Sequence, residues 1–203
     1  MTLSPESERS AEVRRQTAET DITVRIHLDG SGQHKLATGV GFLDHMLAQL
    51  ACHSLVDIEV EARGDLHIDA HHTVEDCALA LGSAFRQALG ARTGIQRMAS
   101  AWVPMDEALA FVALDFSGRG VAVIEAEFSA PSLGSLPTSL IAHFLDSFAR
   151  EAGVNLHARI CAGRDDHHKA EALFKALARA VREAVQRDPR RAGIPSTKGS
   201  LQP

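Results

Sequence analysis

Two copies of the string His-His-x-x-Glu, at residues 71–75 and 167–171, are the part of this chain best suited to do chemistry. On an α-helix, residues four positions apart share a face, so the first histidine and the glutamate of each string can hold one cation together. The second histidine points about 100° away and can reach a different ion. Imidazole and carboxylate ligands suit Mn, Fe, Co, Ni or Zn and leave coordination positions for substrate, whereas closed structural zinc sites usually contain cysteine. The two strings therefore predict a catalytic metal centre.

The two strings lie 96 positions apart, and other features recur at nearly the same distance. His45 and His143 are 98 positions apart, as are the alternating apolar segments 56–60 and 154–158. The two-residue slip falls in a loop, where changes of length are tolerated. A single internal duplication explains all of these matches together.

Two-fold pseudo-symmetry between the halves predicts two metal sites that exchange histidines. Each site would hold three imidazoles and one carboxylate, with room for water or substrate. One predicted site contains His71, Glu75, His143 and His168. Its mate contains His45, His72, His167 and Glu171. Ligands can also come from a neighbouring chain, so this pairing can cross a subunit boundary.

The remaining pattern predicts an α+β fold built from two internally duplicated half-domains. Alternating apolar residues predict strands at 21–28, 56–60, 108–116, 121–128 and 154–160, and apolar stripes predict helices at 42–52, 71–89, 138–151 and 167–187. Each half-domain, 16–93 and 94–190, would be a mixed β-sheet with two helices packed on one face, in a single compact catalytic domain. Residues 1–15 are predicted to be a disordered arm, and residues 191–203 either a flexible tail or a binding arm.

The composition limits the class of protein. Hydrophobic residues make up 45% of the 203 residues and the formal net charge is −5, so the chain can bury a core and has no basic field for nucleic acid. Its three scattered cysteines favour a reducing compartment. The N-terminus lacks the apolar run of a signal peptide, and no segment approaches the ~18 apolar residues of a membrane span. We expect a cytoplasmic protein with no nucleic-acid or membrane partner.

Six motifs occur in order along the chain: GFLDHML at 41–47, DAHHTVED at 69–76, PMDEA at 104–108, DFSGR at 115–119, DHHKAE at 166–171 and PSTKG at 195–199. Together they resemble the imidazoleglycerol-phosphate dehydratase family, and the resemblance covers nearly all of the chain from about residue 15. The chain departs from the family's usual residues at Met98 and Ala99, after Arg97, and at Asp165. None of these departures removes a predicted metal ligand.

The resemblance implies a manganese-dependent hydro-lyase of L-histidine biosynthesis. The reaction would remove water from D-erythro-imidazole-glycerol phosphate and give imidazole-acetol phosphate. The resemblance also implies two Mn²⁺ ions per active site. It further implies a homo-oligomer of 24 subunits with active sites at the subunit interfaces.

The resemblance also assigns roles to residues outside the two strings. Glu171 and Glu19 are the candidate catalytic carboxylates, and Glu19 is also a candidate substrate contact. The phosphate of the substrate needs fixed cations and backbone donors, which the motifs place at Arg97, Arg119, Ser196, Thr197 and Lys198. This makes residues 191–203 a C-terminal substrate-binding arm. Gln49 and His53 share the helix of His45 at spacings of four and eight, and could line the pocket.

The chemistry of this substrate explains why two metal ions would be needed. The carbon–hydrogen bond that must break has no carbonyl beside it and is poorly acidic. Binding both ring nitrogens as a metal-bound imidazolate would push electrons toward the side chain and expel the neighbouring hydroxyl, giving a diazafulvene-like intermediate. A second proton loss gives the enol, which tautomerises to the ketone. A carboxylate near the metals must move the protons.

Two other functions remain compatible with the histidine clusters. A binuclear phosphoesterase would use its metals to activate water, but such sites usually contain several aspartates, whereas histidine outnumbers carboxylate three to one here. A metal-storing cage without turnover would also use many histidines, but it would have no need of the predicted phosphate-binding residues. Formation of a ketone from imidazole-glycerol phosphate, with and without Mn²⁺, separates the three functions.

Overall fold

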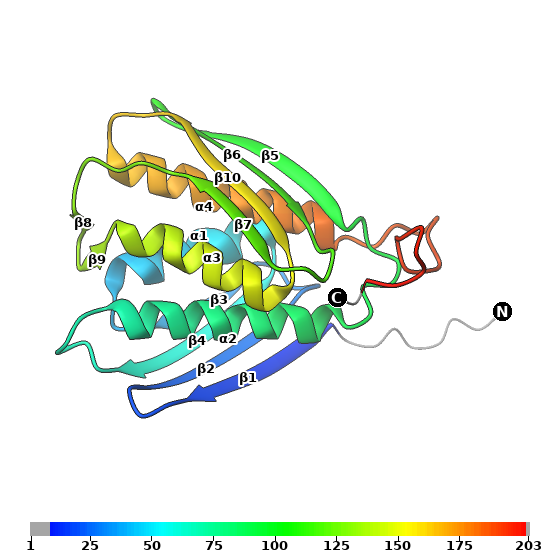
Figure 1. Cartoon of the computed structure of the whole chain (residues 1–203), viewed down its shortest axis with the longest axis horizontal. Coiled ribbons are helices and arrows are strands. Elements are labelled where there is room, and N and C mark those ends of the chain that lie inside the picture. The colour runs from blue at the N-terminus through cyan, green and yellow to red at the C-terminus, as the bar shows by residue number, and fades with distance from the viewer. Residues whose placement is uncertain (1–8, 202–203) are drawn as a thin grey trace.

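The computed structural model describes residues 9–201. Two four-stranded β-sheets form the outer layers of the molecule, and the four helices lie between them (Figure 1). The apolar faces of both sheets and all four helices contribute to one continuous core. Within the described residues, no helix is long and apolar enough to cross a membrane.

The first half contributes one sheet and two helices. Its strands are β1 (Ser10–Gln16), β2 (Thr20–His27), β3 (His34–Ala37) and β4 (Asp57–Gly64), and its helices are α1 (Gly41–Ser54) and α2 (His71–Leu89). The strand order is β1-β2-β4-β3, antiparallel except for the parallel pair of β3 and β4.

The second half repeats this plan. Its strands are β5 (Met98–Met105), β6 (Ala108–Asp115), β7 (Val121–Glu125) and β10 (Asn155–Ala162), and its helices are α3 (Ser139–Ala152) and α4 (Asp166–Val185). The order β5-β6-β10-β7, with β7 and β10 parallel, reproduces the first sheet strand for strand. A small hairpin, β8 (Ser132–Leu133) and β9 (Leu136–Pro137), is added before α3. The predicted duplicated α+β fold is therefore confirmed.

Helices of opposite halves pack on each other, α2 on α3 and α1 on α4. The α2–α3 contact is close: a Cβ added to Gly82 would lie 2.8 Å from the carbonyl oxygen of Phe148. Because each pair joins a helix of one half to a helix of the other, histidines separated by about 100 residues come to lie side by side. The same packing leaves one face of each sheet outside.

The prediction of a disordered arm over residues 1–15 is wrong for its second part. Residues 10–16 form β1, which pairs with β2 along its whole length. Ala11 and Val13 face inward against the core, whereas the outward positions are polar or charged. That outward face made the segment look like a solvated tail. Residues 1–8, the rest of the predicted arm, lie outside the described residues.

The structure also contains strands that the apolar pattern did not predict. Strand β3 is only four residues long, and β5 has exposed Met98 and Trp102 on the same face as Ser100, so neither shows a clean alternation of apolar and polar residues. Residues 191–201 contain no regular strand or helix. The backbone N–H of Gly94 donates to the carbonyl of Gly193, which holds this segment beside the start of the second half.

Candidate metal centre

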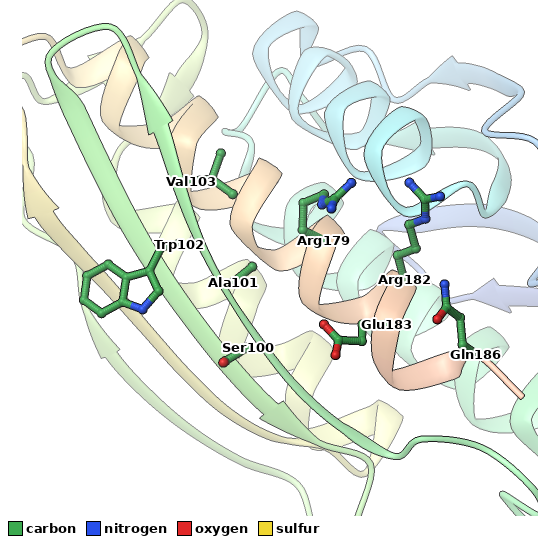
Figure 2. A pocket seen from close by; sticks show the side chains of 8 residues that line it. All are labelled: Ser100, Ala101, Trp102, Val103, Arg179, Arg182, Glu183 and Gln186. Atoms are coloured by element: carbon green, nitrogen blue, oxygen red, sulfur yellow. The ribbon is translucent and has the colours of Figure 1, made fainter. Parts of the chain in front are cut away.

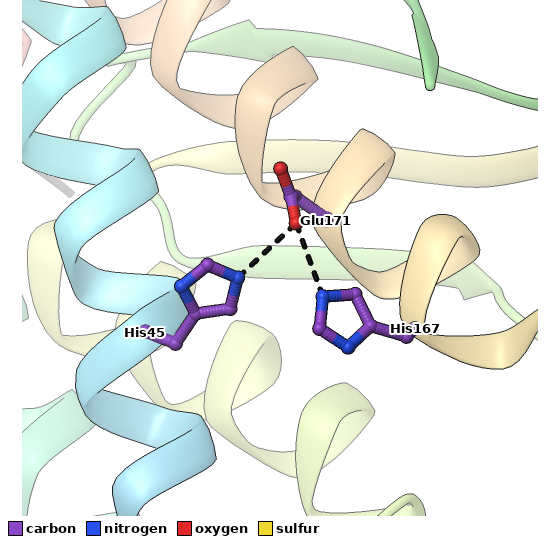
Figure 3. Close-up of side chains that lie close together, drawn as sticks. All are labelled: His45, His167 and Glu171. Atoms are coloured by element: carbon purple, nitrogen blue, oxygen red, sulfur yellow. Dashed lines mark hydrogen bonds and ion pairs between the residues drawn. The ribbon is translucent and has the colours of Figure 1, made fainter. Parts of the chain in front are cut away.

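His45 on α1 and two residues on α4, His167 and Glu171, form the first candidate metal site (Figure 3). The Nε2 atoms of His45 and His167 lie 3.1 Å and 3.2 Å from the same carboxylate oxygen of Glu171. His167 and Glu171 are four residues apart and share a helix face, as the sequence predicts. The α1–α4 packing supplies His45 from the other half.

Glu171 is buried, and its other carboxylate oxygen lies 2.6 Å from Nζ of Lys175. Burial by itself would raise the pKa of Glu171, but hydrogen bonds from Lys175, His45 and His167 outweigh it and lower the pKa to about 2. The carboxylate is therefore ionised at neutral pH, as a metal ligand must be. Lys175 was not predicted as a site residue, although its position four residues after Glu171 places it on the same helix face.

His71 and Glu75 on α2, with His143 on α3, form the second candidate site. The rings of His71 and His143 are 4.7 Å apart, and His143 Nε2 lies 3.3 Å from Glu75. That Nε2 atom is buried and has no hydrogen-bond partner within residues 9–201. A buried ring nitrogen that makes no hydrogen bond but lies close to a carboxylate and a second imidazole fits a metal ligand. In each triad the ligand atoms lie within 4.8 Å of one another.

The adjacent histidines, His72 and His168, belong to neither triad. His72 Nδ1 lies 3.0 Å from Asp65 and 3.6 Å from Glu19. His168 Nδ1 lies 2.8 Å from Glu107. One chain therefore brings together three of the four ligands in each predicted set, and it does not place His72 or His168 with the other three. Their assignment to a metal site stays a prediction.

Each His-His string occupies the first turn of its helix, where an aspartate holds the backbone. Asp69 accepts a hydrogen bond from the N–H of His71, and Asp165 accepts from the N–H groups of both His167 and His168. Side-chain oxygens at these positions satisfy N–H groups that a helix leaves unpaired. These hydrogen bonds fix the backbone of the first turn, which in turn fixes the different directions in which the two histidine side chains of each string leave the helix.

Gln49 and His53 form a polar pair on α1, with His53 Nε2 3.2 Å from the side-chain oxygen of Gln49. The pKa of His53 is lowered, first by burial and then by the charges on Lys175 and Arg179 of α4. The predicted pocket residues of α1 therefore face a cationic stretch of α4. Arg179, eight residues after Glu171, was also missed by the sequence prediction.

The predicted phosphate-binding residues lie at the opposite end of the helices from both triads. The backbone N–H of Arg97 donates to the carbonyl of Ala184, near the end of α4, whereas His167 is in its first turn. At 1.5 Å per residue, this separation is ~25 Å along the helix. The guanidinium of Arg97 bonds to Asp115 and to the carbonyl of Pro195, which ties it to the C-terminal segment.

The other members of the phosphate set lie near Arg97. Ser196, Thr197 and Lys198 directly follow Pro195, and the N–H of Lys198 donates to the hydroxyl of Ser196. Arg119 is exposed beside Gly118, whose N–H donates to Gly153 at the end of α3. A single chain thus gathers the phosphate set at one end and the metal triads at the other.

A pocket of about 480 Å³ lies between β5 and α4 (Figure 2). Trp102, Arg179, Arg182 and Glu183 are among the residues that line it. None of the predicted metal ligands lines this pocket, so its size does not identify it as the reaction site.

Comparison with known proteins identifies the family. The imidazoleglycerol-phosphate dehydratase family model matches residues 38–181. Proteins of that name from Dehalococcoides mccartyi and Methanocella arvoryzae are 59% and 56% identical over 197 and 193 residues, covering 97% and 95% of this chain and 99% and 100% of the relatives.

Solved structures agree with the sequence comparison. The imidazoleglycerol-phosphate dehydratase of Staphylococcus aureus has a TM-score of 0.80 at 30% identity, covering 88% of this chain and 99% of that one. The structure of IGPD from Pyrococcus furiosus has a TM-score of 0.80 at 33% identity, covering 93% of this chain and 100% of that one. The chain therefore belongs to the imidazoleglycerol-phosphate dehydratase family.

Proposed function

We propose that the protein is a cytoplasmic hydro-lyase of L-histidine biosynthesis. Its substrate is D-erythro-imidazole-glycerol phosphate, its products are imidazole-acetol phosphate and water, and it uses two Mn²⁺ ions per active site. Membership of the family supports the reaction. The observation that supports metal chemistry most directly is the pair of histidine–glutamate triads, each assembled from both halves of the chain.

The donor set fits two divalent ions. Each triad offers two imidazoles and one carboxylate and no thiolate, and the buried Nε2 of His143 has no other partner among the described residues. Such nitrogen and oxygen ligands suit several divalent first-row metals, and the choice of Mn²⁺ rests on the family. His72 and His168, which join neither triad of their own chain, are proposed as the fourth ligands, supplied to a neighbouring subunit. When bound, the two ions would act as Lewis acids on the imidazole ring of the substrate.

The reaction requires protons to move at two places on the side chain of the substrate. The hydroxyl on the carbon attached to the ring leaves as water and takes up a proton, through a diazafulvene-like intermediate. The next carbon then gives up its hydrogen to form the enol, which tautomerises to the ketone. We assign these transfers to Glu19 and Glu171. Glu19 is half exposed on the turn before β2, where a substrate could reach it.

The ~25 Å between the triads and the phosphate set is too long for one substrate molecule to contact both in a single chain. We therefore propose that the phosphate is held by Arg97, Arg119, Ser196, Thr197 and Lys198 of a neighbouring subunit. The active sites would then lie at subunit interfaces, in a homo-oligomer that we expect to contain 24 subunits. Gln49 and His53, which lie nearer to the α1–α4 triad, would line the pocket from the chain that holds the metals.

A single assay tests this function. Purified protein is stripped of metal, supplied with Mn²⁺, and given imidazole-glycerol phosphate while the ketone and free phosphate are measured. The expected result is Mn²⁺-dependent ketone formation without release of phosphate. Release of phosphate would instead indicate a phosphoesterase, and tight metal binding with neither product would indicate a metal-storing cage.

A further inference from the structure

Two glutamates occupy matching turns in the two halves. Glu19 lies in the turn between β1 and β2, and Glu107 lies in the turn between β5 and β6. The strand registers relate these turns: Gln16 pairs with Asp21 in the first hairpin, as Pro104 pairs with Leu109 in the second. Each glutamate therefore stands at the same place of the duplicated fold, beside the second histidine of its own half.

The surroundings of the two glutamates differ. Glu107 accepts hydrogen bonds from the backbone N–H groups of Arg164 and Asp165, at 2.9 Å and 2.8 Å, and from His168 Nδ1 at 2.8 Å. Glu19 is 53% exposed and lies 3.6 Å from His72 Nδ1. In the first half, the carboxylate at hydrogen-bond distance from the histidine belongs instead to Asp65, at 3.0 Å.

The second half has no aspartate to match Asp65. The position after the last strand of the second sheet that corresponds to Asp65 is Gly163. Gly163 has a φ of +141°, and a Cβ there would lie 2.8 Å from Cγ of Lys169 and 2.9 Å from Cβ of Ala108. Any side chain at this position would be strained and would collide with its neighbours. Glu107 supplies the carboxylate that Gly163 cannot carry.

We propose that Glu107 is the positioning residue of His168 and that Asp65 is the positioning residue of His72. Because Asp65 takes this role in the first half, Glu19, the counterpart of Glu107, is left free for the substrate. Each carboxylate accepts the Nδ1–H of its histidine, so the neutral ring carries its lone pair on Nε2 and directs that nitrogen to a metal ion. In His168 the Nε2 atom faces outward, 3.5 Å from the exposed carboxylate of Asp106. In the two triads, His45, His167 and His143 also present Nε2. This inference rests on the proposed function, because it concerns metal ligands.

The first measurement is the protonation of the His168 ring in metal-free protein labelled with ¹⁵N-histidine, above the pH at which the ring is charged. Solid-state spectra suit a large assembly, and His168→Gln identifies the signal by its loss. Intact protein is expected to show Nδ1–H, and Glu107→Ala is expected to shift His168 to Nε2–H. An unchanged tautomer in Glu107→Ala would overturn the proposal, because a purely structural role for Glu107 does not set the ring proton.

The second measurement is Mn²⁺ affinity by titration calorimetry, together with metal content after dialysis. Loss of a partner that orients a metal ligand usually costs ten- to a hundred-fold in affinity. Glu107→Ala is expected to weaken one of the two ions by this factor, and Glu107→Gln by less, because an amide oxygen still accepts the Nδ1–H. Asp65→Ala should have the same effect through His72. Glu12→Gln, on the outer face of the first sheet, is the control and should bind Mn²⁺ as intact protein does.

These outcomes separate the inference from the proposed function. If intact protein bound no Mn²⁺, the proposed metal chemistry would fail. If intact protein bound two ions and Glu107→Ala bound them equally well, only the positioning role would fail. Circular dichroism and thermal melting of each variant show whether a loss of affinity comes from a loss of fold.

Discussion

The two candidate metal triads share their ligand types but differ in what surrounds them. Around the α1–α4 triad lie Gln49 and His53 on α1, and Lys175 and Arg179 on α4. The matching positions of the other helix pair are Ser147 and Glu151 on α3, and Leu79 and Ser83 on α2. At these four positions the duplication therefore kept the ligands on both sides, but only the α1–α4 side carries cationic residues, Lys175 and Arg179.

The two triads therefore offer the same ligand types for a cation but differ in burial and in the charges around them. Lys175 pairs with the buried Glu171, whereas Glu75 is about one-third exposed and has Leu79 four residues on. In the second helix pair, Glu151 is paired with Arg86 instead. In the proposed function, Lys175 and Arg179 would favour the approach of an anionic substrate from the α1–α4 side, while the phosphate itself would be held by the neighbouring subunit.

The largest expected effect comes from removing the carboxylate of either triad. Glu171→Gln and Glu75→Gln should each lose one bound ion, and turnover should fall by more than the roughly hundred-fold that loss of an outer partner costs. Metal content per chain and initial rate are the measurements. If the triads are equivalent for binding metal, both variants retain one ion. Retention of two ions by either variant would show that its triad is not a metal site.

The next largest effect is expected from the two turn glutamates, Glu19 and Glu107, whose variants should change different quantities. Glu19→Gln should leave Mn²⁺ affinity intact and lower turnover by about 10²- to 10⁴-fold, the usual contribution of a positioned acid or base. Glu107→Gln should instead lower Mn²⁺ affinity. Rate at saturating Mn²⁺ and affinity by titration distinguish the two. A Glu19→Gln variant with full turnover would remove Glu19 from the proton transfers.

Helical periodicity accounts for most of what could be predicted about the site. His71 with Glu75, and His167 with Glu171, lie within single helices, so their spacing alone predicts their shared faces. The duplication added His45 and His143 by position. Strand β1 was missed because only Ala11 and Val13 of its inward face are apolar, and an edge strand needs no more.

Contacts between residues far apart in the sequence could not be predicted from the spacing of residues along the chain. Glu107 is 61 residues from His168, and the hydrogen bond between them depends on how one turn packs against the start of α4. In the proposed sites the fourth ligand comes from a second chain, so sequence symmetry could suggest an exchange of histidines but not locate it. Lys175 had a usable signal, its spacing from Glu171, but a lone lysine on a helix is usually a surface charge.

Lys175→Met tests the charge difference between the two helix pairs. Without the lysine, the pKa of Glu171 should rise from about 2 toward its ordinary value, and the KM for the phosphorylated substrate should increase. Because folding lowers the pKa of Glu171, its contribution to stability is full above pH ~4.5 and is lost as the pH falls toward 2. Each unit of pKa corresponds to about 1.4 kcal/mol.

Acid unfolding of metal-free protein measures this effect. The variant should lose less stability than intact protein between pH 4.5 and 2. Leu79→Met, at the matching position of α2, is the control. It should change neither the loss of stability between pH 4.5 and 2 nor the KM. Equal acid sensitivity of Lys175→Met and intact protein would show that Lys175 does not set the ionisation of Glu171.

The smallest expected effects concern the packing of the helix pairs. At the matching positions of the two long helices, α2 has Gly82 and α4 has Ala178. A Cβ at Gly82 would lie 2.8 Å from the oxygen of Phe148 and 2.9 Å from the nitrogen of Ala152, so Gly82→Ala should destabilise the protein by about 1–3 kcal/mol through overpacking. Elsewhere in a helix, the same change usually stabilises by about 1 kcal/mol.

Ala178→Gly is the reciprocal variant. It should cost about 1–2 kcal/mol, because it loses helix propensity and the methyl group of a fully buried side chain. Denaturant unfolding of metal-free protein compares the two. The close approach of α2 to α3 holds His143 beside His71 and Glu75, so Gly82→Ala should also weaken metal binding at that triad and spare the one between α1 and α4. If Gly82→Ala were stabilising, α2 and α3 would be free to move apart, and their spacing would not be what fixes the geometry of the second triad.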